Sequence, residues 1–133
     1  MRAVLDANVF VSALLSRTGA PARLVERWLD GELEVVVCER LLDEVERTLA
    51  HRKLGGRVDA GVAARFVALL RELGELAADP EDEPPIRSQD PDDDYLLALA
   101  ARERAPLVTG DSHLLALAER VPVFSPREFL DKL

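Results

Sequence analysis

Short runs of apolar residues alternate with helical patterns along this chain of 133 residues. The clearest run is LEVVVC at 33–38, which is nearly continuous rather than alternating between apolar and polar residues. Similar runs occur at 2–6, 106–111 and 121–124. Continuous apolar strands are typical of parallel sheets, whose two faces are both covered by helices. The pattern predicts an α/β fold, a three-layer sandwich with a central parallel sheet, in a single domain over 1–133.

The segments between these runs carry apolar residues at helical spacing. Glycines at 55 and 56 break the chain, and a Pro-rich acidic loop spans 79–91. The helices predicted from this spacing cover 8–15, 21–30, 39–53, 60–74, 94–104, 112–120 and 126–133.

Four acidic residues lie at or near the ends of these elements: Asp6, Glu44, Asp94 and Asp111. Ligands of parallel sheets bind beyond the carboxyl ends of the strands, where both Asp6 and Asp111 are expected. Carboxylates gathered at one site repel each other and need a compensating cation. Because all-oxygen ligands suit Mg²⁺ or Mn²⁺, the sequence predicts a metal site for phosphodiester chemistry.

Structural explanations exist for the same acids. Asp6 and Asp111 each precede a predicted helix and could cap it, and Glu44 could be an exposed helix acid. Asp6, however, ends an apolar run, where a charge without a partner is costly. Glu44 borders the apolar face of its helix, which favours an inward orientation.

Three consecutive aspartates at 92–94 crowd the start of one predicted helix. We expect Asp94 to face inward, because it lies one helical turn before Leu97 and Ala98. Asp92 is an additional candidate ligand, or a cap of the helix.

The net charge of −8 argues against a general nucleic-acid binder but not against a nuclease, because part of it lies within 79–94. The single cysteine, Cys38, excludes an internal disulfide and is expected to be a buried thiol. No signal peptide and no apolar stretch of transmembrane length is recognisable, which predicts a cytoplasmic protein without a membrane anchor.

The order of the acids resembles the PIN-domain family. VLDANVFVSALL at 4–15 is similar to its first motif, a hydrophobic residue followed by Asp-x-Asn and a later Ser. DPDDDYLLALA at 90–100 is similar to the third motif and LVTGD at 107–111 to the fourth. Glu44 lies on the helix after the second strand, where the family carries an acid.

The segment 90–115 is especially similar to toxin components of toxin–antitoxin pairs, related to the VapC toxins. This resemblance implies a Mg²⁺- or Mn²⁺-dependent ribonuclease with a flavodoxin-like or Rossmann-like sandwich. It also implies a homodimer that is inhibited by a small antitoxin protein. One or two metal ions would then be held by Asp6, Glu44, Asp94 and Asp111.

Polar residues near these acids receive supporting roles in this interpretation. Asn8, Ser12 and Thr109 would orient the ligands or a water molecule. A basic run beside Glu44 could hold the RNA backbone, or could simply be a solvated helix end: Arg47, His51, Arg52, Lys53 and Arg57.

Two alternatives remain open. A haloacid-dehalogenase-like phosphatase also has an Asp after its first strand, but it needs an acid where Asn8 stands and another where Leu114 and Leu115 stand. The other alternative is a PIN-like binding module without catalytic activity. Metal-dependent cleavage of RNA distinguishes this module from the ribonuclease.

Overall fold

The computed structural model of the chain describes residues 1–51 and 58–133. Within these residues five strands form one sheet, and all neighbouring strands are parallel, in the order β3-β2-β1-β4-β5. The strands are β1 (Arg2–Leu5), β2 (Glu34–Val37), β3 (Glu75–Leu76), β4 (Leu107–Val108) and β5 (Val123–Phe124). The predicted α/β fold with a parallel sheet is confirmed.

The central strands are buried along nearly their whole length. Ala3 of β1 pairs with Val35 of β2, and Val4 pairs with both Val36 and Leu107. These side chains are at most 1% exposed. Burial on both faces explains why the strands are continuously apolar, since no side chain of β1 beyond its first residue faces water.

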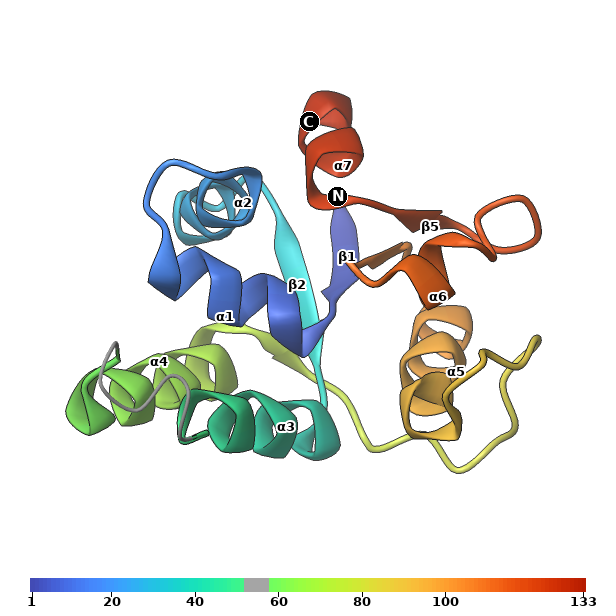
Figure 1. The fold of residues 1–133 in the computed structure, drawn as a ribbon, viewed down its shortest axis with the longest axis horizontal. Helices are drawn as coiled ribbons and strands as arrows, with labels where there is room; N and C mark the ends of the chain where they lie inside the picture. Colours follow the sequence, from blue (N-terminus) through green and yellow to red (C-terminus); the bar gives the residue numbers. More distant parts are fainter. Residues whose placement is uncertain (52–57) are drawn as a thin grey trace.

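Helices flank the sheet on both sides. In Figure 1, α1, α2 and α4 lie to the left of β1 and β2, α3 lies below them, and α5 and α6 lie to the right. The helix α7 packs against α2 and β5. In the described parts of the chain the helices are α1 (Ala7–Leu15), α2 (Ala20–Leu29), α3 (Glu39–Leu49), α4 (Ala60–Leu73), α5 (Asp94–Glu103), α6 (Ser112–Leu115) and α7 (Pro126–Lys132), and a 3₁₀ turn, η1 (Pro91–Asp93), leads into α5.

Three elements differ from the sequence-based expectation. The helix α3 ends at Leu49, before the predicted end at 53, and α6 is much shorter than 112–120. The edge strand β3 was not expected, because both of its side chains are exposed and give no apolar signal. It begins directly after Gly74, where a Cβ atom would lie 2.4 Å from the carbonyl oxygen of Leu70.

The order of the strands reverses between β1 and β4. The chain runs outward from β1 to β2 and β3, then returns to the other side of β1 to form β4 and β5. Ligands of open parallel sheets bind at such a switch point, beyond the carboxyl ends of the strands. Asp6 follows β1 directly, and Asp111 follows β4 after Thr109 and Gly110.

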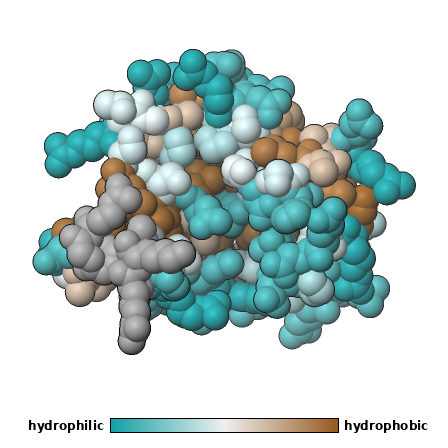
Figure 2. All heavy atoms as spheres, in the orientation of Figure 1, coloured by the Kyte–Doolittle hydropathy of each residue, from teal (hydrophilic) through white to brown (hydrophobic). Residues whose placement is uncertain are grey.

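The face of the molecule that Figure 2 shows is mostly polar. Figure 2 shows hydrophilic residues over most of one face, with hydrophobic residues limited to smaller patches between them. Cys38 lies in the core, as expected from the sequence, and burial raises the pKa of its thiol to about 11. Among the helices that the structure describes, none is both long and apolar enough to cross a membrane.

Candidate functional site

Asp6 is a buried acid at the end of β1, with only 4% of its surface exposed. It occupies the N-cap position of α1, yet its side chain makes no capping hydrogen bond. Instead its Oδ2 accepts a hydrogen bond of 2.8 Å from the hydroxyl of Thr109, which is fully buried. Burial raises the pKa of Asp6, the Thr109 hydroxyl opposes this rise, and the charges of Glu44 and Asp111 add to it.

Thr109 also connects Asp6 to Asp111 across the two neighbouring strands. The backbone N–H of Asp111 donates to the Thr109 hydroxyl oxygen at 3.0 Å. The Oδ1 of Asp111 accepts a hydrogen bond of 2.8 Å from the N–H of His113 and so caps α6. Asp111 therefore is a helix cap, as one interpretation of the sequence expected, and it also lies within the electrostatic field of Asp6.

Glu44 approaches from the other side of the switch point, on α3, and is half-buried. Its Oε2 accepts a hydrogen bond from the hydroxyl of Tyr95, near the start of α5. Tyr95 is only 6% exposed. Burial raises the pKa of its phenol, and the neighbouring Glu44 raises it further, so the phenol stays protonated and donates.

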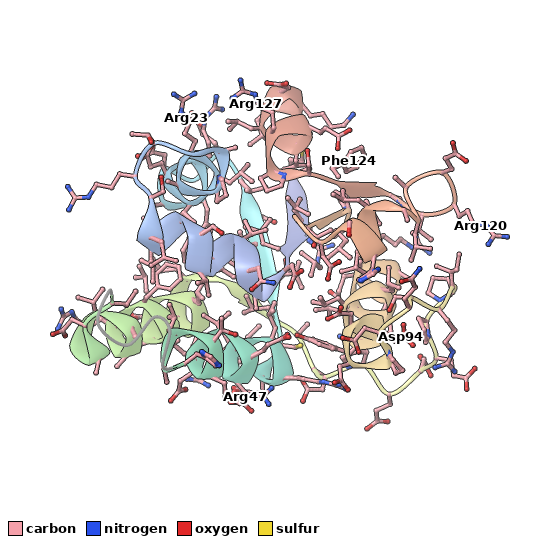
Figure 3. All side chains as sticks on the ribbon, viewed as in Figure 1. Arg23, Arg47, Asp94, Arg120, Phe124 and Arg127 are labelled. Carbon is pink, nitrogen blue, oxygen red and sulfur yellow. The ribbon has the colours of Figure 1, made fainter. Side chains whose placement is uncertain are left out.

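Asp94 does not join these acids. Its Oδ1 accepts hydrogen bonds from the N–H of Ser88 at 2.8 Å and from the Ser88 hydroxyl at 3.0 Å. Its Oδ2 lies 3.4 Å from the guanidinium of Arg87. Burial alone raises the pKa of Asp94, but the hydrogen bonds from Ser88 and Arg87 outweigh it and lower the pKa. Figure 3 labels Asp94 on α5, and the loop that precedes this helix runs beside it in Figure 1.

Asp93, next to the predicted ligand Asp94, is the member of the aspartate run on which the charges of the other acids act. It is half-buried, and burial raises its pKa to about 6, with further increases from the charges of Asp6, Asp90, Glu44 and Asp111. The expectation assumed that 92–94 belongs to one regular helix. The 3₁₀ turn η1 instead changes the direction of these side chains, and Ser88 captures Asp94.

Two clefts adjoin the acids. One, the α3–α5 groove, has a volume of about 430 Å³ and is lined by Arg40, Glu44, Arg47, Thr48, His51, Asp92 and Tyr95. The other, the Asn8 cleft, has a volume of about 300 Å³ and is lined by Asn8, Val9, Ser12, Pro21, Gly110, Asp111 and Pro126. Each cleft is thus lined by one of the acids whose charge acts on Asp93: Glu44 lines the α3–α5 groove and Asp111 lines the Asn8 cleft.

The basic residues predicted beside Glu44 are only partly described. Arg47 and His51 line the α3–α5 groove, whereas Arg52, Lys53 and Arg57 lie outside the described residues. The sequence analysis missed Arg40. It lies four residues before Glu44 on the same helix, a spacing that places both side chains on one helical face and could have revealed it.

The donor chemistry of the acids fits a hard divalent cation. Burial raises the pKa values of Asp6 and Asp93, and the negative charges of the neighbouring acids, Glu44 and Asp111 among them, raise both further. Within the described residues, however, no group of three His, Cys, Asp or Glu side chains is arranged so that it could hold a metal ion.

Comparisons with known proteins agree with this architecture. Residues 2–113 match the family described as the PIN domain. The uncharacterized protein MJ1680 of Methanocaldococcus jannaschii is 23% identical, over 99% of this chain and 91% of its own length. The crystal structure of PAE2754 from Pyrobaculum aerophilum superposes with a TM-score of 0.65 at 17% identity, over 99% of this chain and 88% of that protein. Since the family match covers most of the sequence, the chain belongs to the PIN-domain family.

Proposed function

We propose that this protein is a Mg²⁺- or Mn²⁺-dependent endoribonuclease that hydrolyses RNA phosphodiester bonds. PIN domains are in general nucleases that depend on divalent metal ions. The observation that carries the proposal is the shared field of four acids at the switch point of the sheet: Asp6, Glu44, Asp93 and Asp111. These residues would hold the metal, and Asp94 would instead anchor the preceding loop through Ser88.

Three of the proposed ligands, Asp6, Glu44 and Asp111, accept a hydrogen bond that limits their orientation. Thr109 fixes one oxygen of Asp6, and the N–H of His113 fixes one oxygen of Asp111. When bound, the cation would activate a water molecule and neutralise charge that develops on the phosphate. Asp92 is exposed on the groove side of Asp93 and would contact the metal only through water.

RNA would approach along the α3–α5 groove. The exposed Arg40 and Arg47 line it on either side of Glu44 along α3, and both can contact backbone phosphates. The Asn8 cleft is lined by Asp111 together with Asn8 and Ser12, which would offer neutral polar groups to the same strand. A single strand that crosses from one cleft to the other would place a phosphate over the acids.

The finer assignment follows from the sequence pattern at 90–115, which resembles that of toxin components. We include in the proposal that the protein is the toxin of a type II toxin–antitoxin pair, acts in the cytoplasm and forms a homodimer. A small antitoxin protein would inhibit it. A gene for a small protein next to this one, and co-purification of the two products, would support this assignment.

One observation favours a second candidate function, a PIN-like module that binds RNA without cleaving it. No metal-binding arrangement of three side chains is present in the described residues. The haloacid-dehalogenase-like phosphatase is not retained, because the PIN match covers 2–113.

Cleavage of a generic single-stranded RNA distinguishes the ribonuclease from the silent module. We expect the parent protein to cleave this RNA in the presence of Mg²⁺ or Mn²⁺, and we expect EDTA to abolish the cleavage. By analogy with the family, water attacks the phosphate and the 3′-oxygen leaves, so the products should carry 5′-phosphates and 3′-hydroxyls. Because the 2′-hydroxyl takes no part, an RNA with a 2′-deoxy sugar at the cleavage site should still be cut. Contaminating nucleases that attack through the 2′-hydroxyl fail this last test.

Amide variants identify the acids that act. Asp6→Asn, Asp93→Asn and Asp111→Asn should each reduce cleavage by roughly 10²-fold or more, because each removes charge from the metal site. Asp92→Asn is the matched control and should keep most of the activity. Cleavage that continues unchanged in EDTA, or in the Asp6 variant, would contradict the proposal.

A further inference from the structure

The Tyr95 hydroxyl has a contact that packing does not require. The ring of Tyr95 is buried at the start of α5, where a phenylalanine would fill nearly the same volume. Its hydroxyl reaches across to α3 and donates to Oε2 of Glu44. A buried hydroxyl needs such a partner, so the contact fixes both side chains relative to one another.

Arg40 covers the same ring from the groove. Its guanidinium carbon lies 4.3 Å from the centre of the Tyr95 ring, within the range of a cation–π interaction. The backbone N–H of Arg40 donates to Asp79 at 3.0 Å, and its guanidinium lies 3.5 Å from the carbonyl oxygen of Asp92. Arg40 and Glu44 therefore contact Tyr95 from one helix, through its ring and its hydroxyl respectively.

Glu44 needs such support more than the other proposed ligands do. Its side chain has one more rotatable bond than an aspartate, and ordering a long side chain costs up to roughly 2 kcal/mol. Thr109 holds Asp6, and the N–H of His113 holds Asp111. The corresponding contact to Glu44 comes from Tyr95.

We propose that Tyr95 is a positioning residue: its hydroxyl holds Oε2 of Glu44 and so limits the orientations in which Glu44 would bind a cation, and Arg40 keeps the Tyr95 ring in place. This rests on the proposed function, in which Glu44 is a metal ligand. Partners that orient metal ligands in this way typically change metal affinity by about 10- to 100-fold when they are removed.

The variant Tyr95→Phe tests the hydroxyl alone. We expect it to bind Mg²⁺ about 10-fold more weakly than the parent, measured by titrating Mg²⁺ against the melting temperature. RNA cleavage should recover when Mg²⁺ is raised, and the KM for RNA should stay unchanged because the groove arginines remain. In a Glu44→Ala background, adding Tyr95→Phe should not change the Mg²⁺ affinity any further.

Tyr95 also supplies a spectroscopic signal, because it is the single tyrosine of the chain; the difference from Tyr95→Phe separates this signal from the absorption of the single tryptophan, Trp28. Its near-ultraviolet absorption should change as Mg²⁺ binds to the parent, with the same Mg²⁺ dependence as the melting temperature. The change should be absent in Glu44→Ala. A tyrosine that serves packing alone would give no Mg²⁺-dependent signal.

A pair of arginine variants tests the stacking of Arg40 on the Tyr95 ring without altering Tyr95 itself. Arg40→Ala and Arg47→Ala remove equal charge from the same groove, but Arg40 is the one stacked on the ring. Arg40→Ala should therefore bind Mg²⁺ more weakly than Arg47→Ala.

The outcomes separate this inference from the proposed function. If the parent shows Mg²⁺-dependent melting and cleavage, but Tyr95→Phe has the parent's Mg²⁺ affinity, the positioning role is wrong and the ribonuclease assignment stands. Equal Mg²⁺ affinities of the two arginine variants overturn the role of Arg40. If the parent neither binds Mg²⁺ nor cleaves RNA, the proposed function itself fails.

Discussion

Replacing Asp93 by Asn should stabilise the metal-free protein. The folded-state pKa of Asp93 is about 6, above its ordinary value of 3.8, because burial and the charges of Asp6, Asp90, Glu44 and Asp111 all oppose its ionisation. At neutral pH the carboxylate is nevertheless ionised, so the native state contains a repulsive charge. An amide of the same shape removes that repulsion.

The magnitude follows from the difference between the two pKa values. A difference of about 2 units corresponds to roughly 3 kcal/mol at about 1.4 kcal/mol per unit, which is an upper limit. Asp93 is half-buried, so screening by water reduces the gain to about 1–2 kcal/mol. For a chain of this size the melting temperature in EDTA should rise by about 3–8 °C at pH 7.

The pH dependence gives the sign of the effect. Because the folded-state pKa of Asp93 lies above the unfolded value, the native state binds more protons than the unfolded chain between about pH 4 and pH 6. The penalty is therefore absent below about pH 4, grows up to about pH 6 and is complete above it. Asp93→Asn should therefore be more stable than the parent at neutral pH, and this difference in stability should vanish at the acidic end of this range.

The neighbouring residue supplies a matched control. Asp94→Asn removes charge from hydrogen bonds to Ser88 and Arg87, so it should lower stability at neutral pH by about 1–2 kcal/mol. Its lowered pKa means that this loss should disappear in acid. Melting curves in EDTA at fixed ionic strength measure both effects. If Asp93→Asn is less stable than the parent at pH 7, or Asp94→Asn is more stable, the assignment of the inward acid is refuted.

Three further outcomes are expected. Mg²⁺ should raise the melting temperature of the parent saturably, because it binds the folded state, and a missing shift would argue against a metal site. Thr109→Val should lower stability by about 1–3 kcal/mol and reduce cleavage, because the buried Asp6 loses its donor; parent-like cleavage would remove Thr109 from the site. The pair Arg40→Ala and Arg47→Ala should reduce the log–log salt slope of RNA binding by roughly 1.4, at 0.7 per lost single-strand contact.

The arginine prediction has a control elsewhere on the molecule. Arg23 on α2 and Arg127 on α7 are exposed, and Figure 3 labels them at the opposite end of the view from Arg47. Replacing both by Ala removes the same charge without altering the groove. An equal loss of slope in both pairs would mean that the effect comes from net charge, and not from contacts in the groove.

Much of the fold follows from local sequence patterns. The run 33–38 forms β2 because a strand buried on both faces needs apolar residues at nearly every position. On α3, Leu41, Leu42 and Val45 form the buried face that their spacing predicts. The strand β3 could not be predicted in this way, because backbone pairing with β2 holds it and its side chains are exposed.

The sequence allowed prediction of only those residues of the candidate site whose position follows from the ends of strands. Asp6 and Asp111 follow strands that pair directly, so the parallel sheet brings them to one edge. The choice between Asp93 and Asp94 depends on a 3₁₀ turn and on hydrogen bonds from Ser88, which helical periodicity does not encode. Tertiary contacts of this kind become visible only once the loop at 79–91 is placed against α5.

A crystal structure with Mn²⁺, located by its anomalous scattering, tests the central claim most directly. The account predicts one or two peaks in contact with the carboxylates of Asp6, Asp93 and Asp111, with Glu44 bound directly or through water. Asp94 should remain hydrogen-bonded to Ser88. A peak held by Asp94, or no peak at a Mn²⁺ concentration that supports RNA cleavage, would contradict it.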